Sequence, residues 1–305
     1  MKKRSPFPII LLMLLPAAGL HSQALFQGLN QPINARGWGM GAAACSQFKG
    51  ASGMLYNPAV ISRTPDLWQL NYTSFPLDIA SSSAFAVFHT PLKGKFGILL
   101  NYLDYGSFTE RDMDGNETGS FSVNDLTFRL AYGLQLTRRL SIGLASGYSH
   151  SQLSSLSARA LLGTIGIQYY DDVSTLSVGL SYHNFGTLIE GYANNNESLP
   201  STFIIGVSKK LEHLPMIISI DGYQAYAEEY VAKIGGEFII SDHFFLRWGT
   251  STRRFQIQGQ ETFKNFFAST STGAGIYFGS FFVDMAFVGL GDAGVISSFS
   301  ITQHF

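Results

Sequence analysis

The sequence contains little charge, and its acidic and basic residues nearly cancel. Charged residues make up 13% of the 305 residues, and the formal net charge is −1. That share is roughly half of the ~25% typical of proteins in general, and a soluble protein with so few charges would disperse poorly in water. Nucleic-acid-binding domains are usually basic. The composition therefore argues against nucleic acid as a partner and favours a membrane environment.

Cysteine is almost absent. Cys45 is the single cysteine, so a disulfide within the chain and a metal cluster built from several cysteines are both excluded. It lies in a run of small residues at positions 41–46. Because a buried cysteine behaves as a small apolar residue, we expect Cys45 to have a packing role.

Long apolar runs are missing after the start of the chain. No later segment offers the 18 consecutive apolar residues of a transmembrane helix. The one long run, residues 7–20, follows three basic residues at positions 2–4 and precedes small and polar residues. This order predicts a secretory signal peptide over residues 1–22, with cleavage after Ser22 or Ala24. A retained helical anchor is the alternative, for which the run is short.

What the chain does contain is aromatic residues, glycine and short alternating segments. Aromatics reach 14% and there are 32 glycines. In residues 121–136 every second residue is apolar, including Leu126, Phe128 and Leu130, while polar and small residues such as Asp125 and Arg129 fall between them. A period of two is typical of a β-strand. About fourteen such strands begin near Leu67, Ala80, Lys95, Phe121, Arg139, Leu156, Thr175, Ser201, Pro215, Val231, His243, Thr272, Phe281 and Val295.

Alternating strands fit either a soluble β-sandwich or a transmembrane barrel. Here the second face carries mostly glycine, serine, alanine and threonine, and aromatic residues gather at strand ends. Both features are typical of a barrel whose apolar face contacts lipid. We therefore predict an all-β protein, in which residues 67–305 form a transmembrane antiparallel β-barrel of about fourteen strands in a bacterial outer membrane.

The connections support the same interpretation. The longest, residues 106–120, 185–200 and 253–271, all fall at one predicted end of the barrel, and the short turns fall at the other. Outer-membrane barrels have short periplasmic turns and long extracellular loops. An even strand count predicts both chain ends on the periplasmic side. The last strand ends on Phe305, in phase with its apolar face, as in strands read by the barrel-assembly machinery.

Residues 23–66, ahead of the first strand, are irregular and rich in small residues. We expect them to form a hatch inside the lumen, because lipid cannot satisfy irregular backbone. Arg129 falls on the face opposite to lipid, so we expect it in the lumen beside a carboxylate such as Asp125. It either fills the lumen or forms a constriction or ligand contact.

The remaining motifs do not predict chemistry. Residues 112–116 resemble the start of a calcium loop but lack the glycine and the closing glutamate that such a loop needs, so a polar turn is the simpler interpretation. The glycine-rich residues 37–41 follow no predicted strand, which argues against a nucleotide site. The seven histidines form no catalytic or metal-binding pattern. We expect no catalytic residue, cofactor or metal, and a protein that is not an enzyme.

Two segments resemble the N-terminal motif of the PorV/PorQ family, which is distantly similar to FadL-type transporters. They are residues 35–42, Ala-Arg-Gly-Trp-Gly-Met-Gly-Ala, and residues 54–59, Met-Leu-Tyr-Asn-Pro-Ala. Residues 101–106, 115–125 and 208–211 look most like the PorQ branch. The family often carries acidic residues just before Asn-Pro-Ala, where this chain has Phe-Lys-Gly at positions 48–50, which leaves the branch open. The motif assigns hatch roles to Arg36, Gly39, Gly41, Asn57 and Pro58.

The resemblance implies a barrel of the type IX secretion system in Bacteroidota-like bacteria, which binds secreted cargo or the surface attachment complex. The long loops are then the partner surface, through Phe108, Tyr192, Phe255, Phe263, Phe266 and Phe267, although the last two also suit packing on the rim or in lipid. The alternative is a FadL-like transporter of hydrophobic small molecules, with a lateral opening and the hatch as a gate. A barrel with a purely structural role is a third possibility.

Overall fold

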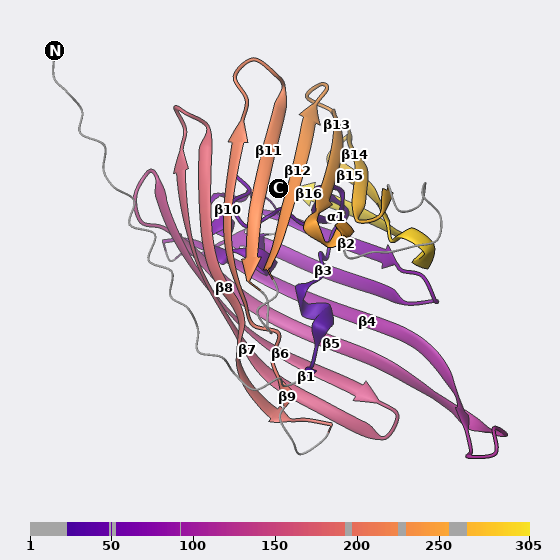
Figure 1. The fold of residues 1–305 in the computed structure, drawn as a ribbon. Coiled ribbons are helices and arrows are strands. Elements are labelled where there is room, and N and C mark those ends of the chain that lie inside the picture. Colours follow the sequence, from indigo (N-terminus) through magenta and orange to yellow (C-terminus); the bar gives the residue numbers. More distant parts are fainter. Residues whose placement is uncertain are drawn as a thin grey trace, which may run out of the picture.

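The computed structural model describes residues 23–48, 50, 53–91, 93–192, 197–224, 230–255 and 267–305, and the predicted signal peptide lies outside them. Fourteen strands, each antiparallel to its neighbours, close into one barrel in which β16 pairs with β2 (Figure 1). The predicted fold class and strand number are therefore confirmed. Within the described residues, no helix is long and apolar enough to cross a membrane.

The barrel strands follow one another around the wall in chain order. They are β2 (Leu67–Ser74), β3 (Ala80–His89), β4 (Lys95–Arg111), β5 (Glu117–Gln135), β6 (Leu140–Leu153), β7 (Leu156–Asp171), β8 (Leu176–Glu190), β10 (Thr202–Lys210), β11 (Met216–Gln224), β12 (Tyr230–Ile239), β13 (Phe244–Ser251), β14 (Thr270–Phe278), β15 (Phe281–Gly289) and β16 (Val295–His304). The strand starts agree closely with those predicted. The largest difference is at β5, which begins at Glu117 instead of Phe121.

The alternation places apolar side chains outside and small or polar side chains inside. On β5, Leu126, Phe128 and Leu130 are each about 40% exposed, whereas Asp125 and Arg129 are buried in the lumen. The outward residues of the other strands form the same apolar surface, as expected for contact with lipid. The period of two in residues 121–136 therefore predicts correctly which side chains point outward and which point into the lumen.

The two ends of the barrel differ in their connections. We call the end with short turns, such as residues 136–139 and 240–243, the turn end, and the other the loop end. The prediction that residues 106–120 form a loop is wrong, because β4 and β5 continue to a turn at residues 112–116. Likewise β8 continues to Glu190, into the predicted loop 185–200. Most residues of the β4–β5 extension are exposed on both sides, so it shows no apolar face that the sequence pattern could reveal.

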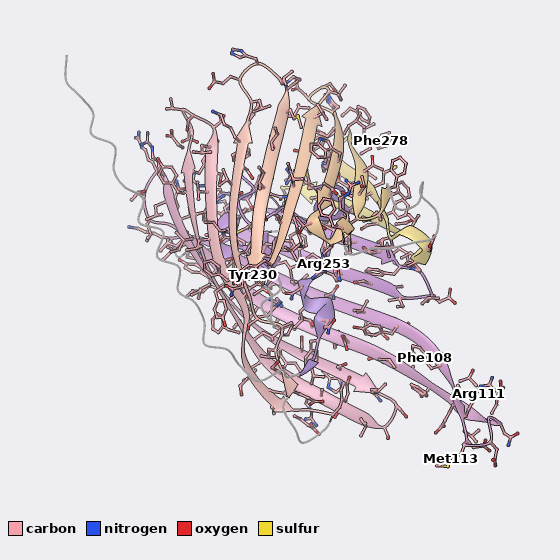
Figure 2. All side chains as sticks on the ribbon, in the orientation of Figure 1. Phe108, Arg111, Met113, Tyr230, Arg253 and Phe278 are labelled. Carbon is pink, nitrogen blue, oxygen red and sulfur yellow. The ribbon has the colours of Figure 1, made fainter. Side chains whose placement is uncertain are left out.

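The barrel wall is taller on one side. Strands β4 to β8 have 14 to 19 residues, whereas β10 to β16, β2 and β3 have 8 to 10. The β4–β5 hairpin reaches furthest, and Phe108, Arg111 and Met113 lie along its projecting part (Figure 2). Beyond His183, β8 has no β10 residue opposite it, because their register ends at the His183–Thr202 pair. The tall side therefore rises above the rest of the wall at the loop end, where Phe26 and Leu29 pack against the inner face of β7.

Residues 23–66 run through the lumen from the loop end to the turn end, and we call them the plug. Its elements are β1 (Gln23–Ala24), η1 (Gln27–Asn30), α1 (Ala35–Gly39), α2 (Gly53–Tyr56) and η2 (Pro58–Arg63). At the loop end β1 pairs in parallel with β9 (Glu197–Ser198). The expectation that both chain ends lie at the turn end is therefore wrong for the start of the plug. Phe305 does lie there, and its N–H donates to the carbonyl of Asp66 at 3.1 Å.

Two short 3-10 helices complete the loop end. They are η4 (Thr252–Phe255), after β13, and η5 (Gly291–Ala293), between β15 and β16.

Candidate functional site: the plugged lumen

The plug backbone is satisfied by side chains of the wall. The Asp221 carboxylate accepts the N–H groups of Ala44 and Cys45 at 2.7 and 2.8 Å, and the Tyr223 hydroxyl donates to the carbonyl of Ala42 at 2.7 Å. Buried backbone groups must find such partners, so a lumen that holds irregular chain needs polar inward residues. Cys45 is completely buried in this contact. This burial agrees with the predicted packing role.

Glycines on the inner wall let the plug approach closely. A Cβ on Gly143 would lie 2.2 Å from the carbonyl carbon of Pro58, and one on Gly179 would lie 2.3 Å from the oxygen of Cys45. The Asn57 side chain accepts from the N–H of Ala59 and donates to the carbonyl of Cys45 at 2.9 Å and to Ile167 of β7 at 3.0 Å. The Asn-Pro-Ala motif thus starts η2 and ties it to the wall.

Helix α1 packs on the opposite side of the lumen, against β13 to β16. Asn34 caps it by accepting from the N–H of Gly37 at 2.9 Å. Gly39 lies against the backbone of β14, and Gly41 has φ +62° and would place a Cβ 2.8 Å from the nitrogen of Thr250. Glycine is needed at position 41 for both reasons. The glycines of the N-terminal motif therefore allow α1 to lie flat on the wall.

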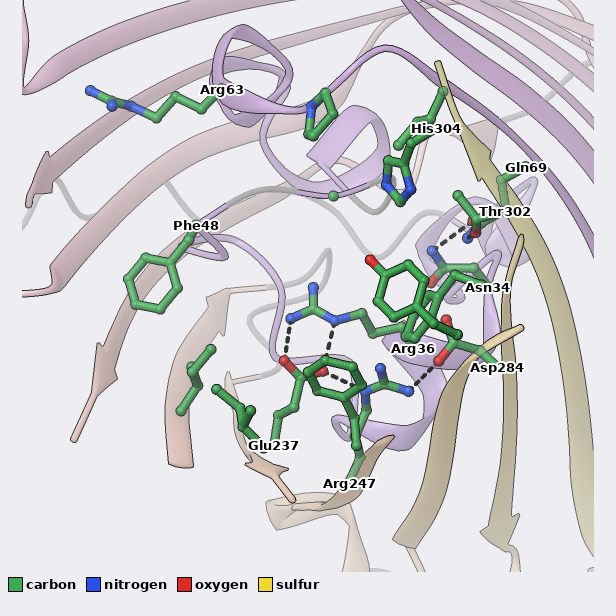
Figure 3. Close-up of a pocket in the computed structure, with 18 of the residues that line it drawn as sticks. Asn34, Arg36, Phe48, Arg63, Gln69, Glu237, Arg247, Asp284, Thr302 and His304 are labelled. Atoms are coloured by element: carbon green, nitrogen blue, oxygen red, sulfur yellow. Dashed lines mark hydrogen bonds and ion pairs between the residues drawn. The ribbon is translucent and has the colours of Figure 1, made fainter. Parts of the chain in front are cut away.

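A chain of alternating charges holds α1 in place. Arg36 of α1 donates through Nε and Nη2 to the Glu237 carboxylate, both at 3.0 Å, and Arg247 donates to the same carboxylate at 2.6 Å (Figure 3). Arg247 also pairs with Asp284. The Glu237, Arg247 and Asp284 side chains are 6%, 1% and 1% exposed, whereas Arg36 is 19% exposed. We call these four residues the ion chain, and Arg36 is its plug member.

A cavity of about 570 Å³ lies beside the ion chain at the turn end. Its wall comes from strands β7, β10 to β16 and β2, and its plug side includes residues of α1 and η2. Five aromatic side chains line it together with the ion chain (Figure 3): Phe48, Tyr170, Phe245, Tyr277 and Phe282. Apolar and aromatic walls with a few placed polar groups are typical of small-molecule sites.

The loop end of the lumen holds an apolar cluster. Phe26 and Leu29 of the plug pack against Ala158, Ala160 and Leu162 of β7. Leu199, Leu188 and Tyr192 join the same cluster. The plug therefore meets apolar surface at the loop end and a partly charged cavity at the turn end.

The two predicted lumen residues lie inside the barrel, but they do not pair. Asp125 accepts hydrogen bonds from Tyr105, at 3.0 Å, and from Ser151. Arg129 instead donates to the Asn184 amide oxygen at 2.5 Å and weakly to Thr164 at 3.4 Å. Asn184 reaches this position because β8 is irregular there, with φ +57° at Asn184. The expected Arg129–Asp125 contact is therefore wrong, since a distant strand supplies the partner.

The predicted partner residues at the loop end are scattered. Phe108 stacks on Phe121 across the hairpin at 5.5 Å and remains 45% exposed, and Phe255 and Phe267 are 78% and 45% exposed. Tyr192 does not lie at an exposed tip, because its hydroxyl bonds to Ser151 and its ring joins the apolar cluster. Phe263 and Phe266 lie outside the described residues.

Sequence reasoning missed Glu237, Arg247 and Asp284. Each is a charge at an inward position of an apolar strand, which is the signal that identified Arg129. No group of three or more His, Cys, Asp and Glu side chains suited to a metal occurs in the described part of the chain. At the turn of residues 112–116, Asp112 accepts from the Asn116 side chain and from backbone N–H groups of the turn. These hydrogen bonds lower the pKa of the Asp112 carboxyl.

These features define the class: a transmembrane β-barrel of fourteen strands with an N-terminal plug in its lumen. Among the solved structures that share the fold are the following three. The Pseudomonas putida toluene transporter TodX aligns with a TM-score of 0.58 and 14% identity, over 87% of this chain and 95% of that one. A Pseudomonas aeruginosa FadL homologue aligns with 0.61 and 13%, over 90% and 98%. The CymD monoaromatic hydrocarbon channel aligns with 0.60 and 12%, over 90% and 97%.

Likeness at such identities establishes the fold alone. No protein-family model matches the sequence, and no curated protein matches it significantly. The resemblance to the PorV/PorQ family therefore stays a prediction.

Proposed function

We propose that this protein carries small hydrophobic molecules across the outer membrane. The observation that carries the proposal is the aromatic-lined cavity of about 570 Å³ at the turn end, beside a plug that runs the length of the lumen. In an outer-membrane barrel the turn end faces the periplasm. A molecule that enters at the loop end then meets the apolar cluster around Phe26 and Leu29, passes α1 and leaves through the cavity.

The similar structures support this direction. TodX is a toluene transporter and CymD is a monoaromatic hydrocarbon channel, and each aligns with this chain over at least 95% of its own length. In this chain, α1 rests on the wall through glycine contacts and through Arg36, which is the most exposed member of the ion chain. Displacement of α1 joins the loop-end side of the lumen to the cavity, so the Arg36–Glu237 contact is the proposed gate.

Uptake by whole cells tests the proposal. A Gram-negative host without its own hydrocarbon transporter expresses the full-length protein, and uptake of radiolabelled toluene is compared with uptake of a disaccharide of larger size. We expect faster toluene entry and unchanged disaccharide entry. Unchanged toluene uptake, or an equal rise for both solutes, would contradict the proposal, because the second result indicates a plain water-filled pore.

A second candidate function is a partner role in type IX secretion in a Bacteroidota-like outer membrane. The specific observation in its favour is the β4–β5 hairpin, which projects beyond the wall (Figure 2). Phe108 is partly exposed there, and Met113 is fully exposed at its tip. With the Asn-Pro-Ala resemblance, these apolar side chains suit contact with secreted cargo or with the surface attachment complex.

The hairpin provides the test that separates the two functions. Replacing residues 107–120 by a two-residue turn leaves the pairing of β4 and β5 below Asp104 intact. A secretion partner should then lose surface attachment of cargo while hydrocarbon uptake stays normal. Unchanged cargo attachment rules out the hairpin as the docking site.

A further inference from the structure

The centre of the lumen contains a buried positive charge for which the described residues provide no carboxylate. Arg129 is 1% exposed, and its guanidinium donates to two neutral oxygens, those of Asn184 and Thr164. Its Nε is buried without a hydrogen-bond partner in the described structure. A buried guanidinium with neutral partners is costly, because desolvation is not offset by an opposite charge.

His183 lies next to this charge and also lacks partners. Its ring is buried to 1% exposure, and neither ring nitrogen has a hydrogen-bond partner among the described residues. His183 lies opposite Thr164 in the β7–β8 pairing, and Thr164 is one of the two residues to which Arg129 donates. The side chains that act on the ring are Arg129, Lys233 and the neighbouring Asn184. The Tyr56 ring packs edge-on against it at 6.5 Å between centroids, and the Tyr56 hydroxyl is buried and unpartnered as well.

Three of the unpartnered buried atoms share one chemical property. Arg129 Nε–H, an imidazole N–H of His183 and the Tyr56 hydroxyl are all hydrogen-bond donors. Asp125 accepts from Tyr105 and Ser151. Asp221 Oδ2 accepts from the plug backbone, and Asp221 Oδ1 is buried without a hydrogen-bond partner in the described structure. Neither carboxylate contacts Arg129, whose guanidinium donates to Asn184 and Thr164.

We infer that Arg129 and His183 form a binding site for one anionic group in the middle of the lumen. The group is a chloride-sized anion or a carboxylate, because one guanidinium edge and one imidazole N–H supply the donors. It offsets the Arg129 charge and joins the plug, through Tyr56, to the wall. A free anion and the headgroup of an amphiphile share this chemistry, and the site stands whether or not the barrel transports hydrocarbons.

Thermal unfolding of the full-length protein in detergent tests the site. The measurement is Tm in a low-salt buffer and after stepwise addition of sodium chloride, sodium acetate or sodium octanoate, and the same additions to Arg129→Met give the effect of ionic strength alone. A ligand that binds only the folded state raises Tm, and we expect a rise of roughly 2–4 °C at saturation. A rise with chloride and acetate identifies a free anion, and a rise with octanoate alone identifies an amphiphile headgroup.

Arg129→Met gives the decisive comparison. If an anion compensates the charge, this variant loses the anion dependence and has a lower Tm than wild type in the stabilising salt. If nothing compensates it, removal of a buried uncompensated charge leaves Tm unchanged or raises it in every salt, and the inference fails. The inference also fails if no anion changes the Tm of the wild-type protein.

Two further variants keep the test interpretable. Arg159→Met removes an arginine whose ion pair with Glu190 is about half exposed, and it should keep the full anion dependence. Should Arg129→Met not fold, His183→Leu replaces it as the site variant. It should weaken the dependence on the effective anion at least several-fold in concentration, and an unchanged midpoint concentration contradicts the site.

Discussion

At the scale of single residues, the charged side chains of the ion chain depend on one another for charge compensation. Arg247 contacts both Glu237 and Asp284, whereas Arg36 contacts Glu237 alone within the ion chain. Removing one partner of a buried ion pair leaves an uncompensated charge, which costs more than the pair itself contributes. The members of the ion chain are therefore unequal, and their order can be measured.

We expect Arg247→Ala to lower the free energy of unfolding by about 3–5 kcal/mol, because it leaves two buried carboxylates with one arginine. Arg36→Ala should cost less, about 1–3 kcal/mol, since Glu237 keeps Arg247. Urea unfolding in detergent micelles measures both. Arg111→Ala, which breaks an exposed pair with Glu117 on the hairpin, is the control and should have no measurable effect. Equal losses for Arg36 and Arg247 would contradict the assigned order.

The inner-wall glycines give a second prediction at this scale. Gly143→Ala forces a Cβ into the backbone of Pro58, so η2 must shift, and we expect a loss of roughly 1–3 kcal/mol from overpacking. Gly222→Ala is the matched control, because its nearest neighbour is the Ile205 side chain at 3.6 Å. The measurement is the Tm of each variant compared with that of the wild-type protein. A Gly143→Ala protein as stable as wild type would mean that the plug is not seated as described.

At the scale of elements, the single cysteine of the plug can report whether the plug is in place. Cys45 is the single cysteine and is completely buried where the plug meets β8, β10 and β11. The thiolate is the reactive form, and a reagent must reach the sulfur to modify it. Because Cys45 is completely buried, it is protected from the reagent while the plug is in place, whatever the pH.

We expect a maleimide reagent to leave Cys45 unmodified in the folded protein at pH 7 and at pH 9. Denatured protein should be labelled fully at both values. Arg36→Ala, which releases α1, should raise the labelling rate at least several-fold without unfolding the barrel, as judged by its heat-dependent gel mobility. Rapid labelling of the wild-type protein would show that the plug leaves the lumen spontaneously.

At the scale of the whole molecule, the sequence predicts the wall better than the contents of the lumen. Strand facing is local, because alternation in residues 121–136 alone places Leu126 outside and Arg129 inside. Pairing inside the lumen is not local. Arg129 contacts Asn184, 55 residues away along the chain, and Arg36 contacts Glu237, 201 residues away. Spacing along one strand pointed to Asp125 and could not reveal either partner.

The direction of the plug was also beyond the sequence. Residues 23–24 pair with Glu197–Ser198 at the loop end, while the plug joins β2 at the turn end. Nothing in residues 23–66 distinguishes this course from a hatch that enters and leaves at the turn end, because short irregular elements carry no orientation signal. The placement of Gln23 and Ala24 at the loop end depends on a two-residue parallel pairing with β9, which is far away along the chain.

This course predicts the accessibility of a tag. An epitope inserted after Ala24, behind both cleavage sites of the predicted signal peptide, should be detected by antibody on intact cells. An epitope added after Phe305 should be detected only after the outer membrane is permeabilised. Detection of neither tag, or of both, on intact cells would contradict the opposite placement of the two positions.

Because the plug lies lengthwise in the barrel, a molecule that crosses the lumen must move beside the plug. The plug is fixed at the loop end by β1 and at the turn end by its covalent link to β2. A passing molecule therefore cannot displace the whole plug from the lumen. In the proposed transport, the passage that opens beside the plug when α1 moves is therefore narrow and long. We expect girth, not length, to set the limit of what passes, so that a linear alkane crosses faster than a branched isomer of the same mass.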